Sequence, residues 1–315
     1  TAPASSYYLF RTEDVASEFP VEEQNWLAAA EKADSIGVQL ISSSLGYNTF
    51  DDASFNYTYA DMNGKKAMIT RGATMASQKG MIVMNSAGNS GNSAWKYIIA
   101  PADALDVLAV GAVNSLKQIA PFSSYGPSSD NRVKPDIASV GWNTFLISTN
   151  GTVAQGNGTS FSNPNIAGLV ACLWQAFPEF SNKEIIAAVR KSGDRYSNPD
   201  VRTGYGIPNM RLAYEMLEKE RNSIKAKGIL KADRLRIYPN PMTDQFTIVY
   251  NGKTNGKLSV QLLSMDGKMI RNLSYDVLEN EYYFFNVNGL GIQGSGQYIL
   301  SYKDGIGAGT LKIMK

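Results

Sequence analysis

The 315-residue sequence contains no histidine, only one cysteine and no long apolar run. Histidine is the side chain that most often acts as a general base, so these residues alone do not predict a complete hydrolase. One cysteine excludes an intrachain disulfide and a cysteine-cluster metal site. Because no apolar run reaches roughly 18 residues, no transmembrane helix is expected. The formal net charge of +2 gives no reason to expect a nucleic-acid partner.

The residues that are present predict a globular protein with a buried core. Hydrophobic residues make up 43% of the chain and charged residues 18%, which is ordinary for such proteins. Cys172 lies within the apolar stretch Val170–Trp174. We therefore expect its thiol to be buried and structural.

Short apolar runs alternate with helical patterns over the first two thirds of the chain. The runs end at Gly, Asn or Ser, as buried parallel strands do, and the alternation indicates βαβ units in an α/β domain. The predicted strands are Ser6–Phe10, Val38–Ser42, Met81–Asn85 and Val107–Val113. The predicted helices are Glu22–Ile36, Lys65–Lys79, one from Ser160 through Trp174, and Ser181–Ser192.

After about residue 232 the pattern changes to short strands with no helix between them, which predicts a small all-β sandwich. Residues 219–232 carry five basic side chains and one acidic one, as a solvated linker or a helix end would. We therefore predict a domain over 1–218, a linker over 219–232 and a sandwich over 233–315. The predicted strands of the sandwich are Phe246–Tyr250, Leu258–Leu263, Met269–Ser274, Tyr282–Val287 and Gln297–Tyr302.

Ser160 is the strongest candidate for chemistry. It follows Gly158-Thr159 at the start of an apolar helix, where unpaired backbone N–H groups and the positive end of the helix dipole favour a developing oxyanion. Serine is also a common helix cap. The heptapeptide Gly158–Pro164 alone fits a nucleophile and a cap equally well.

Two strand ends support the catalytic interpretation. Asn89 follows Ser86-Ala87-Gly88 at the end of a predicted strand, where its amide is able to donate to an oxyanion, although an isolated Asn in this setting is more often a turn residue. Ser44-Leu45-Gly46 follows another strand, and strand carboxyl ends line the ligand crevice of an α/β sheet. Together the three segments favour acyl transfer.

The order of six motifs along residues 1–217 resembles the subtilase family of serine peptidases. The motifs are Ser44-Leu45-Gly46, Ala87-Gly88-Asn89, Val110-Gly111-Ala112-Val113, Phe122–Pro127, Lys134-Pro135-Asp136-Ile137 and Gly158-Thr159-Ser160. The resemblance implies a partial subtilisin-like parallel-sheet domain, followed here by the small sandwich. It also implies a secreted endopeptidase that hydrolyses peptide bonds through an acyl-enzyme.

By the same resemblance, Ser160 is the nucleophile and Asn89 the oxyanion donor. Ser44, Leu45 and Gly46 on one side, and Ser86, Ala87 and Gly88 on the other, form the walls that bind an extended peptide substrate. The family orders its triad as Asp, His, Ser. Thr1-Ala2-Pro3 resembles the segment after the histidine helix, so we expect both missing members in an N-terminal segment upstream of this chain, and we expect the chain alone to be inactive.

Asp61 and Asn63 place oxygen ligands at alternate positions, as a calcium loop does. No glutamate follows at the distance of an EF-hand, so a surface turn is favoured over a metal site. The family resemblance requires no cofactor and is compatible with structural calcium.

The last 83 residues resemble the C-terminal sorting domain of proteins exported by the type IX secretion system of Bacteroidota. The resemblance rests on Ile237-Tyr238-Pro239-Asn240-Pro241, on Leu263 and Gly267-Lys268, on Gly296-Gln297-Tyr298, and on the closing Leu311–Lys315. It implies a secreted or cell-surface protein that has the type IX machinery as a partner.

Two alternatives remain at this stage. One is a catalytically inactive subtilase-like scaffold that serves as a surface binding module. The other is an adhesive β-sandwich with an accessory α/β domain, which predicts glycan or surface binding without serine reactivity. Sequence upstream of Thr1 would separate the enzyme from the inactive scaffold, because the enzyme needs a histidine there.

Overall fold

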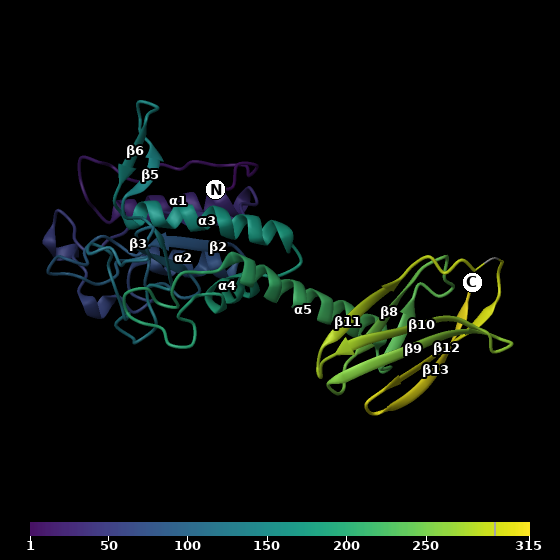
Figure 1. Ribbon diagram of the computed structural model, residues 1–315. Coiled ribbons are helices and arrows are strands. Elements are labelled where there is room, and N and C mark those ends of the chain that lie inside the picture. Colours follow the sequence, from purple (N-terminus) through teal and green to yellow (C-terminus); the bar gives the residue numbers. More distant parts are fainter. Residues whose placement is uncertain (293) are drawn as a thin grey trace. The chain divides into compact units, whose positions relative to one another are not determined.

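The computed structural model describes residues 1–292 and 294–315, which divide into two compact units, Thr1–Leu217 and Glu218–Lys315 (Figure 1). No helix in the described part of the chain is both long and apolar enough to cross a membrane. The predicted boundaries at residues 218 and 233 remain a prediction.

The first unit is built on a parallel sheet, as predicted. Its strands are β1 (Leu40–Ser43), β2 (Ile82–Ser86), β3 (Leu108–Val113) and β4 (Ile137–Val140), in the order β1-β2-β3-β4. Every residue of β2 and β3 is buried, which explains their continuous apolar sequences. The α/β fold class is therefore confirmed.

Helices cover both faces of this sheet. Val83 of β2 packs in one core with α1 (Val21–Ser35) and α2 (Met68–Gln78). Its neighbours on the strand, Ile82 and Met84, pack in another core. The helices of that second core are α3 (Thr159–Ala176), α4 (Asn182–Lys191) and the start of α5 (Met210–Leu230). Alternate side chains of one strand thus serve two cores.

An antiparallel hairpin precedes α3. It consists of β5 (Thr144–Ile147) and β6 (Val153–Gly156), and its outer side chains Phe145 and Val153 are 73% and 69% exposed. Two single-turn 3-10 helices, at Ala53–Phe55 and Tyr59–Asp61, lie between β1 and α2.

Two sequence predictions for this unit are wrong. Residues 6–10 form no strand, because no described strand runs beside them to pair their backbone groups, and Leu9 is 93% exposed. Cys172 is exposed. The buried stripe of α3 follows Ile166, Val170 and Leu173, so Cys172 lies on the opposite face of that helix.

A buried ion network fixes the entry to β4. Asp136 accepts hydrogen bonds from Lys134 Nζ at 2.8 Å and from the Ala109 N–H at 2.8 Å, and it pairs with Arg190 at 2.6 Å. The side chains of Lys134 and Asp136 are each only 3% exposed. Burial alone would raise the pKa of Asp136, but Arg190 and Lys134 hold it below its ordinary value. The network ties β3 and α4 to the loop before β4.

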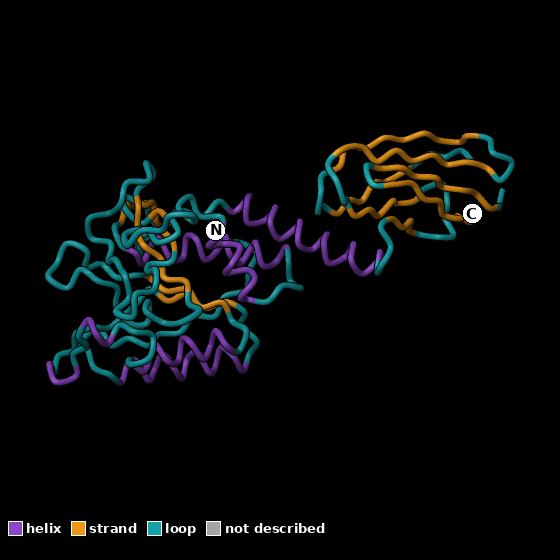
Figure 2. The backbone as a smooth tube through the Cα atoms, turned by 90° about the horizontal axis from the view of Figure 1, so that it is seen from below, coloured by secondary structure: helices purple, strands orange, loops and turns teal. Residues whose placement is uncertain are grey.

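The second unit is the predicted antiparallel sandwich (Figure 2). One sheet has the order β10-β9-β12-β13 and the other β11-β8-β7. Its strands are β7 (Leu235–Tyr238), β8 (Phe246–Asn251), β9 (Gly256–Ser264), β10 (Met269–Val277), β11 (Tyr282–Val287), β12 (Gln297–Asp304) and β13 (Gly307–Met314). Their inner side chains, such as Leu262 and Leu300, form one core.

The segment predicted as a linker is helical for most of its length, since α5 continues to Leu230. Ala226 and Leu230 are buried against Val249 of β8. Ala226 and Leu230 are four positions apart, so they lie on the same side of the helix. The structure thus places a helix over residues 219–230, and the linker role of the segment remains a prediction.

Candidate active site

Ser160 lies in the first turn of α3 and is half-buried. Gly158 is the N-cap residue, and Gly158 and Thr159 are both buried. The backbone N–H groups of a first helical turn have no partners within the helix, and the helix dipole is positive there. The hydroxyl of Ser160 therefore stands beside groups that stabilise negative charge.

Pro164 explains how Ser160 is joined to the strand end at Ser44. Proline has no N–H, so the Ser160 carbonyl loses the hydrogen bond that it would receive from residue 164 within the helix. The Ser44 hydroxyl donates to this carbonyl at 3.0 Å instead. In return, Ser160 Oγ donates to the Ser44 carbonyl at 3.3 Å. This reciprocal pair holds the predicted nucleophile against one predicted substrate wall.

Asn89 is exposed and forms hydrogen bonds to Thr159 at the N-terminus of α3. Its Oδ1 accepts hydrogen bonds from the Thr159 N–H at 2.8 Å and from the Thr159 hydroxyl at 3.0 Å. Because both donors occupy the amide oxygen, the orientation of the amide is fixed. Among the described residues Asn89 Nδ2 has no partner, and it lies 3.7 Å from the place that a Cβ on Gly158 would occupy. The free amide nitrogen is thus beside the helix N-terminus.

The second predicted wall, Ser86 to Gly88, is buried, and the backbone N–H and C=O groups of Ala87 and Gly88 are hydrogen-bonded within the chain. Gly88 has a φ of 109°, a conformation that favours glycine, and an added Cβ would meet Ser124 Oγ at 2.8 Å. Its N–H donates to the Thr159 hydroxyl at 3.3 Å. Thr159 therefore links this wall to Asn89, a role that the sequence analysis missed because Thr159 looked like part of a serine motif only.

The first wall continues from β1 through Leu45 and Gly46, which are half-buried. Asn85 Nδ2 donates to the Leu45 carbonyl at 3.0 Å, so the end of β2 supports the segment that follows β1. A Cβ on Gly46 would lie 2.8 Å from the Ala100 carbonyl oxygen, which leaves no room for a side chain. The structure thus brings all the predicted catalytic and wall segments to one edge of the sheet.

Within residues 1–292 and 294–315, no base lies beside the Ser160 hydroxyl. The chain has no histidine. Among the described residues, the Ser160 hydroxyl is hydrogen-bonded only to the Ser44 carbonyl, which accepts a hydrogen bond but does not act as a base. The arrangement holds a serine and an oxyanion donor in place. It does not by itself activate the serine.

The predicted calcium pair forms a local turn. Asp61 Oδ2 accepts from the Thr58 N–H and hydroxyl, each at 2.8 Å, and Asn63 Oδ1 accepts from the Lys65 N–H at 2.9 Å. These oxygens cap the chain around the second 3-10 helix. Asp61 belongs to no group of three acidic side chains among the described residues, and the calcium role of the pair remains a prediction.

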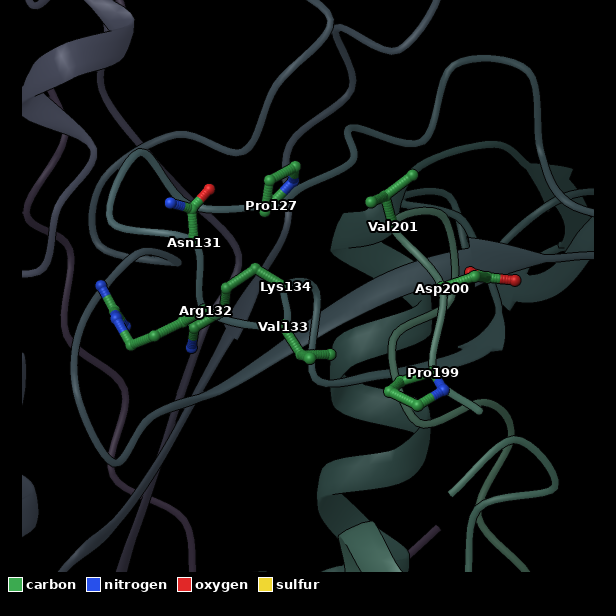
Figure 3. Close-up of a pocket in the computed structure, with 8 residues that line it drawn as sticks. All are labelled: Pro127, Asn131, Arg132, Val133, Lys134, Pro199, Asp200 and Val201. Carbon is green, nitrogen blue, oxygen red and sulfur yellow. The ribbon is translucent and has the colours of Figure 1, made fainter. Parts of the chain in front are cut away.

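A small pocket of about 120 Å³ lies elsewhere in the first unit (Figure 3). Arg132 and Asp200 on its wall already pair with Asp130 and Arg195. None of the predicted site residues lines it, and it is below the size of ligand pockets, roughly 300–1,000 Å³. Its lining residues are Pro127, Asn131, Arg132, Val133, Lys134, Pro199, Asp200 and Val201.

Comparison with known proteins gives two family matches. The profile of the subtilase family matches residues 13–207, and the profile of the secretion system C-terminal sorting domain matches residues 236–315. Subtilisin BL of Lederbergia lenta is 34% identical over 147 residues, which cover 47% of this chain and 51% of that protein. M-protease of Shouchella clausii (strain KSM-K16) is 30% identical over 147 residues, which cover 47% of this chain and 36% of that protein. The chain thus spans about half or less of these relatives.

Solved structures share the fold at lower identity. MycP1 with its N-terminal propeptide removed aligns with a TM-score of 0.51 at 21% identity, over 65% of this chain and 68% of that one. The prenylagaramide maturation protease PagA aligns with a TM-score of 0.50 at 21% identity, over 62% of this chain and 67% of that one.

Proposed function

The chain belongs to the subtilase family, and we propose that it carries the nucleophile and oxyanion-donor part of the active site of a secreted serine endopeptidase. The observation that carries this proposal is the joint placement of Ser160 and Asn89. Thr159 orients the Asn89 amide with two hydrogen bonds, which leaves Nδ2 free at the N-terminus of the helix that bears the serine. That arrangement suits acyl transfer.

In the proposed reaction, Ser160 Oγ attacks the carbonyl carbon of a peptide bond and gives its proton to a base. The carbonyl oxygen becomes an oxyanion, which Asn89 Nδ2 and the N-terminus of α3 stabilise. The tetrahedral intermediate then expels the amine, which takes the proton from the base. Water then attacks the acyl-serine and gives a proton to the base. The second tetrahedral intermediate expels Ser160 Oγ, which takes the proton back from the base and releases the acid product.

We infer that the base comes from outside residues 1–315, because the chain contains no histidine and, among the described residues, Ser160 Oγ is hydrogen-bonded only to the Ser44 carbonyl. We infer that a segment upstream in the same gene product supplies a histidine and its orienting aspartate. Surfaces of the first unit support this inference. Leu9 is 93% exposed, Leu169 on α3 is 39% exposed, and β1 is an edge strand of the described sheet. Exposed apolar side chains and an open sheet edge are features that a further packed segment would cover.

We propose that the substrate is a peptide in extended form, bound between the wall that starts at Ser44 and the wall that ends at Gly88. Gly46 and Gly88 have no room for side chains, which supports a close approach of a peptide backbone to both walls. Main-chain binding of this kind recognises a peptide backbone, and it leaves the choice of side chain to the pockets around it.

The experiment uses the complete gene product and an assay of peptide hydrolysis. Ser160→Ala should abolish turnover. Asn89→Ala should lower kcat by roughly 10²–10³, the value known for removal of one oxyanion donor in subtilisin, which is the type case for this effect. Asn92→Ala, an exposed asparagine three positions further on, is the matched control and should leave kcat unchanged. A kcat for Asn89→Ala within about threefold of the parent would refute the oxyanion assignment.

A catalytically inactive scaffold is the second candidate, and the absence of histidine is the observation that favours it. It predicts that the complete gene product also lacks a histidine near Ser160 and hydrolyses no peptide. For the second unit, we propose that the sorting domain directs export through a type IX system of Bacteroidota and attachment to the cell surface.

A further inference from the structure

Three glutamates meet beside the first turn of α1. Glu13 and Glu18 precede the helix, and Glu22 lies in its first turn. One carboxylate oxygen from each lies within 4.8 Å of the others. The three residues are far enough apart in sequence that a fold of the chain over 13–22 is needed to bring them together.

Hydrogen bonds hold that fold in place. Glu22 Oε1 accepts from the Asp14 N–H at 2.6 Å, which folds the chain back toward the helix. Glu18 and Asp51 bond each other reciprocally, with N–H to carboxylate at 3.2 Å and N–H to carbonyl at 3.0 Å. Tyr47 donates its hydroxyl to Glu13 Oε1. Hydrogen bonds therefore position the carboxylates of Glu13 and Glu22 and the backbone of Glu18.

Glu22 carries a buried carboxylate oxygen that a cation would stabilise. Glu22 is only 2% exposed, and its Oε2 is buried with no hydrogen-bond partner among the residues that the structure describes. An ionised carboxylate oxygen buried without a partner is costly, and proteins pair such groups or bind a metal ion with them. The cluster therefore contains a buried oxygen that is free to act as a ligand.

No side chain in the described part of the chain neutralises the cluster. None of the ion pairs formed there involves Glu13, Glu18 or Glu22. The carboxylates thus repel one another when they are ionised.

We propose that Glu13, Glu18 and Glu22 bind a divalent cation, and that calcium fits the site best. Calcium takes six to eight oxygen ligands at about 2.3–2.6 Å in flexible geometry, so two ligand oxygens on opposite sides of one ion lie up to about 5 Å apart. The oxygens of this cluster fall within that limit. The ion would satisfy Glu22 Oε2, and the half-buried positions of Glu13 and Glu18 leave room for water as further ligands.

The cation site is connected to the first peptide wall. Glu13 is bonded to Tyr47, and the Tyr47 N–H donates to the Ala100 carbonyl at 2.8 Å. Tyr47 directly follows Ser44-Leu45-Gly46. A bound ion would therefore stiffen the end of that wall. This consequence rests on the proposed function, whereas binding of the ion does not.

The test uses the purified 315-residue chain, stripped of metal with a chelator. Calcium at about 100 times its Kd should raise the Tm of the chain by roughly 5 °C or more, and magnesium at the same concentration should raise it less. Glu22→Gln should abolish the calcium-dependent rise. Glu31→Gln, an exposed glutamate on the same helix, is the matched control and should retain it. Terbium should bind in place of calcium and emit when tyrosine is excited, because Tyr47 contacts a proposed ligand.

A Tm that calcium leaves unchanged, or a rise of equal size in Glu22→Gln and the parent, would overturn the proposal. If Glu22→Gln does not fold, the half-buried Glu18→Gln decides. Loss of the calcium-dependent rise and of terbium emission supports the site, and their retention overturns it. Since the chain is assayed without peptide hydrolysis, failure here leaves the proposed function untouched.

Discussion

Replacing Asp136 by Asn should unfold the first unit at markedly lower urea concentration. The substitution keeps the shape of the side chain but removes its charge. It leaves Lys134, whose side chain is 3% exposed, and Arg190, whose side chain is 25% exposed, without their anion. The new amide N–H₂ group would also face one of these donors.

The magnitude follows from the burial of the partners. Removing one member of a buried ion pair costs about 3–5 kcal/mol, because the remaining charge stays buried and unpaired. This is a large part of the total stability of a domain, about 5–15 kcal/mol. Asp34→Asn is the control, since it breaks the pair between Lys79 and Asp34, whose side chains are 60% and 37% exposed. Water screens an exposed pair of this kind, so it contributes little to stability.

Tryptophan fluorescence during urea unfolding measures this effect for the first unit alone. All four tryptophans, Trp26, Trp95, Trp142 and Trp174, lie in that unit. The free energy of unfolding should fall by about 3 kcal/mol or more in Asp136→Asn and should change little in Asp34→Asn. Equal losses in the two variants would show that the buried network does not stabilise the unit as its geometry indicates.

Three further predictions concern activity, export and acid stability. The isolated 315-residue chain should hydrolyse no peptide in a mixed-peptide assay, and turnover that a serine-directed inhibitor blocks would place the base within this chain. Deletion of residues 218–315 keeps the part of α5 that packs in the first core. It should leave hydrolysis by the complete gene product nearly unchanged but prevent export of the protein. A reporter fused to residues 218–315 that stays in the periplasm would contradict the sorting role. Burial would raise the pKa of Asp304, but hydrogen bonds from Tyr250 and backbone N–H groups, together with Arg234, hold it below its ordinary value. Its stabilising contribution is therefore present above pH 4, roughly the unfolded value, and is lost as the pH falls through the folded value, so calorimetry from pH 7 to pH 3 should show a smaller loss of stability in Asp304→Asn than in the parent.

The parts of the fold that the sequence predicted well are those where burial and local chemistry agree. β2 and β3 are buried at every residue, which is why their continuous apolar runs predicted buried parallel strands correctly. The helix α4 begins with the capping box of Ser181 and Glu184, and both of its hydrogen bonds are present. Such signals lie within a few residues of one another and need no tertiary information.

The errors arise where a distant partner decides the outcome. Residues 6–10 have the composition of a strand but no described neighbour to pair with. Cys172 has apolar neighbours in sequence but lies on the face of α3 opposite to the buried stripe. Likewise, the role of Thr159 depends on Asn89, which is 70 positions away. The glutamate cluster escaped notice because only the turn before α1 brings its members together.

The most direct test of the account is to locate the reactive serine in the complete gene product. A fluorophosphonate reagent should react with one serine, and mass spectrometry of the digested protein should find the adduct on Ser160. The isolated chain of 315 residues should remain unlabelled under the same conditions, because its serine has no base. An adduct on any other serine of a protein that hydrolyses peptides, or hydrolysis that persists in Ser160→Ala, would contradict the assignment of Ser160 as the nucleophile.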